Sequence, residues 1–146
     1  MEDAGLVPGL QAEAMLLVAP EHLASRWGSG GVDVLATPQM IGLMELAAVR
    51  AVDALLPEGY CTVGAQVSIR HVAATPLGGR VTARARLEQV DGRRLVFRVI
   101  AVDDSGLVGE GTHERYIVER ERFVQRAVAR AVAGQAGSRG LCTDVP

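Results

Sequence analysis

The sequence predicts an α+β fold in which one antiparallel β-sheet wraps around a single long central α-helix. Two observations support this class: residues 35–56 carry an apolar pattern with helical spacing, and four long strand patterns, separated by short turns, follow it. Strands joined by short turns form an antiparallel sheet, and an apolar helix is the natural cover for one of its faces. We expect one domain over residues 1–133 and a disordered tail over residues 134–146.

The composition excludes several classes of function. With 15 basic and 17 acidic residues the net charge is −2, so the chain has no broad electrostatic footprint for a nucleic acid or a membrane. Cys61 and Cys142 are too few and too far apart for a disulfide framework or a zinc site. No apolar run approaches the roughly 18 to 20 residues that cross a bilayer. We therefore expect a soluble, cytoplasmic protein without a metal ion, a nucleic-acid partner or a membrane partner.

The segment before the long helix begins with a strand. Residues 12–19 have the composition of a strand that Pro20 closes, and residues 21–27 have that of a short helical turn. Gly28, Ser29, Gly30 and Gly31 then form a flexible loop, which is a type of segment that can act as a lid. Trp27 is either the apolar anchor of that lid or an ordinary core or interface residue.

The long helix carries both a start signal and a stop signal. Thr37 is in position for an N-cap, and Pro38 occupies the first helical position, where its missing N–H costs nothing. Pro57 and Gly59 end the helix. At 100° per residue only one side has room for water, and it carries Gln39, Gly42, Leu46, Arg50 and Asp53.

Glu45 projects from the apolar flank of this helix. A buried carboxylate without a partner is costly, so two interpretations compete. Glu45 either sits at the rim of the apolar stripe and reaches solvent, or faces a cleft as a catalytic acid or base with a raised pKa or a charged partner. Its neighbours on the helix surface are Ile41, Ala48, Val49 and Val52.

His71 ends a strand pattern over residues 60–71 that alternates with period two. It is either a hydrogen-bonded residue at the edge of the core or a catalytic group. Because the helix that carries Glu45 is the natural cover for the apolar face of this strand, both titratable groups could share one interface. The apolar face is Cys61, Val63, Ala65, Val67, Ile69 and His71, and the other face is Thr62, Gly64, Gln66, Ser68 and Arg70.

The remaining strands follow in meander order. Residues 81–90 and 94–102 alternate as strands on either side of the hairpin signal Asp91-Gly92. Another turn leads to a last strand over residues 107–118. Apolar residues at helical spacing beyond Glu119 predict a final helix that ends near Ala133.

Five short motifs follow one another along the chain. They are Leu35-Ala36-Thr37, Met44-Glu45, Arg70-His71 with Ala73-Ala74-Thr75-Pro76, Asp91-Gly92-Arg93-Arg94, and Gly109-Glu110-Gly111-Thr112-His113-Glu114-Arg115. These motifs and their order resemble those of the fluoroacetyl-CoA thioesterase family of hotdog-fold enzymes, and the resemblance covers roughly residues 12–120.

This resemblance implies hydrolysis of a small acyl-CoA thioester, with coenzyme A as part of the substrate and no other cofactor. It places the catalytic constellation at Thr37, Glu45 and His71, with Gly64 on the strand where the thioester or the attacking water is held. It also implies a homodimer whose active site lies at the subunit interface, so that Glu45 and His71 could meet across subunits. The family's fluoroacetyl-specific member has aromatic side chains before the threonine, where this chain has glycines 28, 30 and 31. Fluoroacetyl specificity is therefore not expected.

Thioester hydrolysis needs a nucleophile, a base and donors that stabilise an oxyanion. The roles stay open: Glu45 acts as nucleophile or as general base on a water, His71 shuttles the proton, and Thr37 binds or attacks the carbonyl. Thr37 could equally be an N-cap alone, worth about 1 kcal/mol of stability. The backbone N–H groups of Met40 and Ile41 are predicted to lack intrahelical partners and to bind the substrate carbonyl.

Two further residues, Gly64 and Arg115, have two interpretations each. Gly64 is either a bulge or close-packing glycine, or a residue that leaves room for the thioester. His113 and Arg115 share a face of the last strand, where Arg115 forms a structural ion pair with a carboxylate or binds the CoA phosphates. Arg93 and Arg94, at the hairpin, are alternative phosphate ligands.

Two other functions are alternatives to a thioesterase. A non-catalytic hotdog domain that binds an acyl-CoA or a similar ligand would keep the cleft without needing the three groups together. A hotdog hydratase acting on an enoyl thioester usually needs an Asp and His pair a few residues apart. The sequence has no such pair at a strand-to-helix junction, so the hydratase ranks last.

Overall fold

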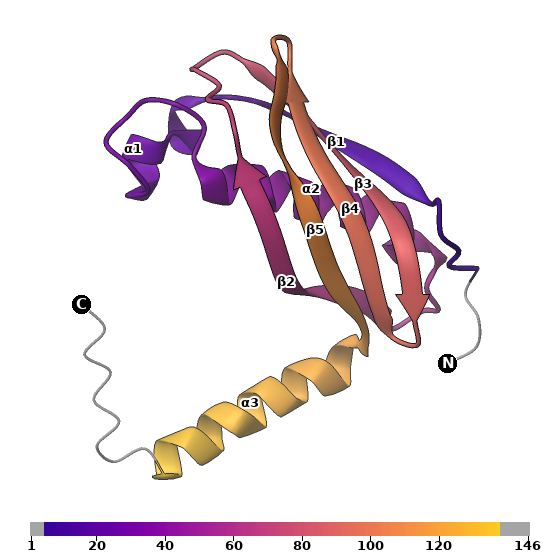
Figure 1. Ribbon diagram of the computed structural model, residues 1–146. Coiled ribbons are helices and arrows are strands. Elements are labelled where there is room, and N and C mark those ends of the chain that lie inside the picture. Colours follow the sequence, from indigo (N-terminus) through magenta and orange to yellow (C-terminus); the bar gives the residue numbers. More distant parts are fainter. Residues whose placement is uncertain (1–4, 138–146) are drawn as a thin grey trace.

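The computed structural model describes residues 5–137, and its elements follow the predicted order. A strand and two short helical turns precede one long helix, four strands come next, and a second long helix ends the described chain (Figure 1). The bounds are β1 Gln11–Leu17, η1 Pro20–His22, α1 Ala24–Trp27, α2 Thr37–Val52, η2 Asp53–Leu55, β2 Tyr60–His71, β3 Arg80–Asp91, β4 Arg94–Asp103, β5 Gly106–Glu119 and α3 Arg120–Gly137.

The five strands form one antiparallel sheet in the order β1-β3-β4-β5-β2, and the sheet curls around α2 (Figure 1). The fold is therefore the hotdog arrangement that the sequence predicts. The inward face of α2 packs against alternate residues of the strands, and Phe97 of β4 is completely buried in the core. Within the sheet β1 and β2 are the two edges. The buried residues of α2 are Met40, Leu43, Met44, Ala47, Ala48, Ala51 and Val52.

The start of α2 differs from the prediction in one respect. Ala36, not Thr37, is the N-cap, and no side chain caps the helix. The N-cap interpretation of Thr37 is therefore wrong, and its hydroxyl makes a different contact, described below. The side of the helix expected to face water is exposed at Gly42 and Leu46, as predicted.

A β-bulge in β2 changes which residues face the helix. The pairing with β5 shifts between Gly64 and Gln66, so the strand presents a different set of residues on either side of the bulge. Thr62 is buried, whereas the alternation predicted Cys61 and Val63 for the apolar face. The predicted face is wrong for the first half of the strand, because one extra residue reverses the alternation. The helix-facing set is Thr62, Gly64, Val67, Ile69 and His71, paired with Ile117, Arg115, His113, Gly111 and Gly109.

The other strands match their predictions closely. A two-residue turn of Gly92 and Arg93 joins the paired residues Asp91 and Arg94, and Gly92 adopts the positive φ of 60° that such a turn requires. Trp27, in contrast, is 53 % exposed, and its indole N–H donates to the carbonyl of Glu21. It does not anchor the loop as an apolar residue.

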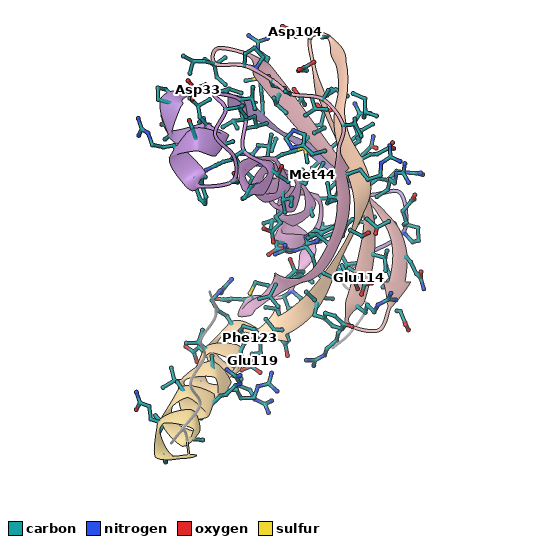
Figure 2. The ribbon with its side chains drawn as sticks, turned by 60° about the vertical axis from the view of Figure 1, so that its left-hand side comes forward. Asp33, Met44, Asp104, Glu114, Glu119 and Phe123 are labelled. Atoms are coloured by element: carbon teal, nitrogen blue, oxygen red, sulfur yellow. The ribbon has the colours of Figure 1, made fainter. Side chains whose placement is uncertain are left out.

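The final helix α3 runs past the predicted end at Ala133 to Gly137. It leaves the sheet where β5 ends and extends away from it, and Figure 2 shows Phe123 in its first turn, close to Glu119. Of the predicted tail, residues 134–137 belong to this helix, and residues 138–146 lie outside the described residues. Among the described helices, none is both long and apolar enough to cross a membrane.

Candidate active site

The first turn of α2 and the last residue of β2 meet at a short side-chain contact. The Oγ1 atom of Thr37 lies 2.7 Å from Nδ1 of His71, within hydrogen-bond distance. The other ring nitrogen of His71, Nε2, is buried and has no hydrogen-bond partner among the described residues. Burial lowers the pKa of His71, and the backbone of Ala73 offsets this only in part. The imidazole is therefore neutral near pH 7, and it contacts a hydroxyl group that a base could activate.

A cavity of about 330 Å³ lies beside this pair, and we call it the Thr37–His71 cavity. The loop between α1 and α2 contributes Ser29 and Val32 to its wall, and the chain after β2 contributes Ala73 and Ala74. A ligand in this cavity would lie against the threonine hydroxyl.

Glu45 lines a second, separate cavity of about 230 Å³, the Glu45 cavity, together with Ile41 and Gly64. Its side chain is 43 % exposed, and Oε2 lies 3.5 Å from Nη1 of Arg115. The geometry fits the solvent access of the first interpretation and the charged partner of the second, and the catalytic role stays a prediction. The carboxylate reaches solvent at the mouth of a cavity, and it also has a charged partner.

Arg115 is the centre of a buried polar network beneath the Glu45 cavity. Only 5 % exposed, it donates from Nε to Oγ1 of Thr62 at 2.8 Å and from Nη2 to the carbonyl of Thr62 at 2.9 Å. Thr62 in turn donates from Oγ1 to Asp53 at 2.6 Å. Burial lowers the pKa of Arg115, while the carboxylates of Asp53 and Glu45 raise it. The buried guanidinium contacts Thr62, His113 and Glu45, as the structural ion pair predicts, and a contact with the CoA phosphates stays a prediction.

His113 completes this network. Its Nδ1–H donates to the carbonyl of Gln66 at 2.8 Å, and Nε2 accepts from Nη1 of Arg115 at 3.1 Å, so both ring nitrogens have a partner. Burial, with help from the nearby Arg115 charge, lowers the pKa of His113. This histidine is therefore neutral and holds Arg115 in place under Glu45.

Gly64 lies where the Glu45 carboxylate approaches the backbone of β2. A Cβ atom at this position would lie 2.6 Å from Oε2 of Glu45, which is much closer than van der Waals contact allows. The bulge of β2 begins at the same residue. Gly64 is thus both a bulge glycine and a residue that leaves space for a functional group.

A single chain does not bring the predicted constellation together. Thr37 and His71 share one cavity, whereas Glu45 lines the other, and no hydrogen bond connects them among the described residues. Because a helix rises 1.5 Å per residue, the eight residues from Thr37 to Glu45 span about 12 Å along α2.

The prediction that the amide of Met40 is free to bind a carbonyl oxygen is wrong. Its N–H donates to the carbonyl of Ala36 at 3.1 Å, and its side chain is completely buried. Ile41 does line the Glu45 cavity, but its N–H lies within the helix, where it pairs with the carbonyl four residues earlier. The helix start therefore does not supply the predicted pair of donors.

Sequence reasoning did not find Asp53 and Thr62 as supports of the site. Asp53 was assigned to the water-facing side of the helix, and Thr62 to the polar face of β2. A glycine inside a strand often marks a bulge, but only the pairing of β2 with β5 reveals that Thr62 turns inward.

Comparison with known proteins identifies the family. A family model described as a fluoroacetyl-CoA-specific thioesterase matches residues 18–121. The chain belongs to this family. The fluoroacetyl-CoA thioesterase of Streptantibioticus cattleyicolor is 43 % identical over 102 residues, which cover 70 % of this chain and 73 % of that protein.

Solved structures support the same family assignment. A crystal structure of a point variant of a fluoroacetyl-CoA-specific thioesterase superposes with a TM-score of 0.81 at 35 % identity, and the match covers 88 % of this chain and 99 % of that one. A thioesterase superfamily member from Thermus thermophilus has a TM-score of 0.78 at 30 % identity, with 91 % and 97 % covered. The resemblance seen in the motifs is confirmed, and with it the hotdog fold and the enzyme class, a thioester hydrolase.

Proposed function

We propose that this protein hydrolyses a small acyl-CoA thioester to the free acid and CoA, with Thr37, His71 and Glu45 as its catalytic residues. The observation that carries the proposal is the 2.7 Å contact between the Thr37 hydroxyl and the His71 imidazole beside an open cavity. A nucleophile within hydrogen-bond reach of a neutral base is the arrangement that acyl transfer requires.

The contact between Thr37 and His71 suggests a sequence of proton transfers. The Thr37 hydroxyl donates its proton to Nδ1 of His71 as Oγ1 attacks the thioester carbonyl. The same proton then passes to the departing CoA sulfur, and a water molecule hydrolyses the resulting ester on Thr37. The lowered pKa of His71 supports this role, because a neutral imidazole has a ring nitrogen free to accept the hydroxyl proton near pH 7.

Glu45 enters this mechanism from a second copy of the chain. We propose that Glu45 of the partner subunit acts as general base on the water that releases the acid. Its distance from Thr37 in one chain, about 12 Å along α2, supports a contribution across subunits. Arg115 then positions the carboxylate through the 3.5 Å ion pair. Arg115 would therefore contribute to substrate binding only indirectly, by holding the Glu45 carboxylate in place.

The edge strand β2 is the surface that we propose for the homodimer. Only one of its sides pairs with another described strand, β5, and Val67 on it is 42 % exposed. Two copies that pair antiparallel about a twofold axis between Val67 and Ser68 would place Gly64 opposite His71. Because Glu45 lies against Gly64, this register would bring the carboxylate toward the Thr37–His71 pair of the other subunit.

Relatives with solved structures support a CoA thioester as the substrate. Structures of the fluoroacetyl-CoA-specific thioesterase include one complex with fluoroacetate and CoA and another with acetyl-CoA. We propose a cytoplasmic location as well, which the free thiol of Cys61 supports, because disulfides are rare in reducing compartments.

Release of CoA from short acyl-CoAs, detected with a thiol reagent, tests the function directly. We expect turnover by the wild-type protein and a loss of on the order of 10²-fold or more in kcat for His71→Ala and for Glu45→Ala, with thermal unfolding still cooperative. If no acyl-CoA in the panel is hydrolysed above background, the protein is instead an acyl-CoA-binding module. Full turnover by either variant removes that residue from the mechanism.

A further inference from the structure

Most of the side chains that line the Thr37–His71 cavity are aliphatic. Seven of its ten lining residues are aliphatic, and the only polar side chains are those of Ser29, Thr37 and His71. No lining side chain carries a full charge near pH 7, because the lowered pKa of His71 keeps its imidazole neutral. Beyond the two catalytic side chains, a ligand group that enters this cavity therefore meets mainly aliphatic side chains, none of which carries a charge.

The volume of the cavity exceeds what a two-carbon acyl group fills. At about 30 Å³ for each water-sized group, 330 Å³ holds on the order of ten such groups, whereas an acetyl group provides only three heavy atoms. A chain of about four to eight carbons would occupy most of this space and cover the aliphatic wall.

The loop after α1 forms part of the cavity wall, and its first residues carry few side chains. Among residues 28–31 only Ser29 has one, and a Cβ added at Gly28 or at Gly31 would meet no atom within 4 Å. Two backbone hydrogen bonds tie the loop to α1, from Ala24 N–H to Val34 at 2.8 Å and from Ser25 N–H to Val32 at 3.1 Å. Figure 2 shows Asp33 in this loop beside α1, and its carboxylate accepts from Ser25 Oγ. These contacts hold residues 32–34, two of which line the cavity, against α1.

We propose that the Thr37–His71 cavity binds the acyl group and selects uncharged aliphatic chains of about four to eight carbons over both two-carbon and carboxylated acyl groups. The inference rests on the proposed thioesterase function. A terminal carboxylate would find no cationic side chain in the lining of this cavity, whereas each added methylene that contacts the aliphatic side chains gains burial. One buried methylene corresponds to about a fourfold gain in kcat/KM, so hexanoyl-CoA should exceed acetyl-CoA by about 10²-fold.

Val32 offers a way to change this selectivity with little effect on the fold. It lines the cavity and is 57 % exposed, so an arginine can replace it without being buried. Val7 is a matched control, because it is a loop valine, 53 % exposed, and does not line the cavity. The Val32→Arg variant should favour succinyl-CoA over butyryl-CoA by about tenfold relative to wild type, and Val7→Arg should not.

The experiment measures kcat/KM of wild type, Val32→Arg and Val7→Arg for acetyl-, butyryl-, hexanoyl-, octanoyl-, dodecanoyl- and succinyl-CoA. We expect an optimum between butyryl- and octanoyl-CoA, and succinyl-CoA at least tenfold below butyryl-CoA, which has the same chain length. Acetyl-CoA as the best substrate, equal rates for succinyl- and butyryl-CoA, or identical profiles for the two variants would overturn the proposal.

A binding measurement separates this proposal from the proposed function. Calorimetry with the unreactive thioethers S-ethyl-CoA, S-hexyl-CoA and S-(3-carboxypropyl)-CoA reports the preference of the cavity whether or not turnover occurs. Tighter binding of S-hexyl-CoA, weakened in Val32→Arg but not in Val7→Arg, supports the acyl site even if no thioester is hydrolysed, in which case only the catalytic function fails. Equal affinity for all three thioethers overturns the acyl site even if the protein is an active thioesterase.

Discussion

Replacing Gly64 by alanine tests the position of Glu45 with a single methyl group. The new Cβ would lie 2.6 Å from Oε2 of Glu45, while ordinary van der Waals contact begins at 3.4 Å, so the carboxylate must move by close to an ångström. The backbone of Gly64 has no positive φ, so alanine fits the strand without strain. The contact is made by the end of a flexible side chain, so the fold survives and the carboxylate shifts.

The expected effect follows from how strongly catalysis depends on geometry. A misplacement of about 1 Å in a reacting group costs roughly 10²-fold in rate, so we expect Gly64→Ala to lower kcat/KM by about that factor. The melting temperature should change little. Gly42→Ala is the matched control, because an added Cβ there meets no atom within 4 Å, and in a helix the change stabilises by about 0.5–1 kcal/mol.

The assay is CoA release at several acyl-CoA concentrations, repeated with Gly64→Ala in a Glu45→Gln background. If both substitutions act through the same carboxylate, the second adds little to the first. Wild-type activity in Gly64→Ala, or losses that multiply in the double variant, would refute the assignment of Glu45 as the group that Gly64 accommodates.

Four other predictions concern the nucleophile, the pH dependence of activity, the pH dependence of stability and the buried network. Thr37→Ser should retain far more activity than Thr37→Ala in the CoA-release assay, and equal losses would indicate that the hydroxyl does not react. Because burial lowers the pKa of His71, kcat/KM should rise with pH around a midpoint below 6.5 and stay level above it, and a midpoint above 6.5 would contradict a neutral base. Because the pKa values of His71 and His113 are lowered in the folded protein, the unfolded chain binds more protons than the folded one below pH 6.5. The free energy of unfolding, measured in urea, should therefore fall as the pH drops through 6.5. A rise in that free energy would contradict the direction of these pKa shifts. Arg115→Met should cost about 3 kcal/mol of stability, because it leaves Asp53 and Thr62 without their cation. Arg122→Met is the control, because Arg122 forms an exposed pair with Glu119, and it should cost less than about 1 kcal/mol.

The fold follows from patterns that are local in the sequence. Alternation in three of the strands and the turn at Gly92 need no knowledge of distant residues, so these strands and their antiparallel pairing were predictable. The bulge of β2 was not, because it depends on how Gly64 and Gln66 pair with β5, about fifty residues away. That single shift moved Thr62 from the predicted outer face to the core.

The candidate site was predictable in its residue types but not in its connections. The motifs point to Thr37, Glu45 and His71, and the contact between the first and the last of them is present. Helical periodicity could place Glu45 on an apolar flank, yet it could not show that Arg115 lies beneath it or that His113 holds Arg115. Those contacts depend on the curl of the sheet around α2, which no local pattern encodes.

Mixed dimers test the central claim, that a catalytic site combines His71 of one subunit with Glu45 of the other. Neither Glu45→Gln nor His71→Ala should be active alone, and the two chains can be co-expressed with different tags and purified as the heterodimer. The account predicts that the heterodimer regains about half of the wild-type kcat per dimer, because one of its two sites then contains both native residues. A heterodimer as inactive as either parent would contradict it.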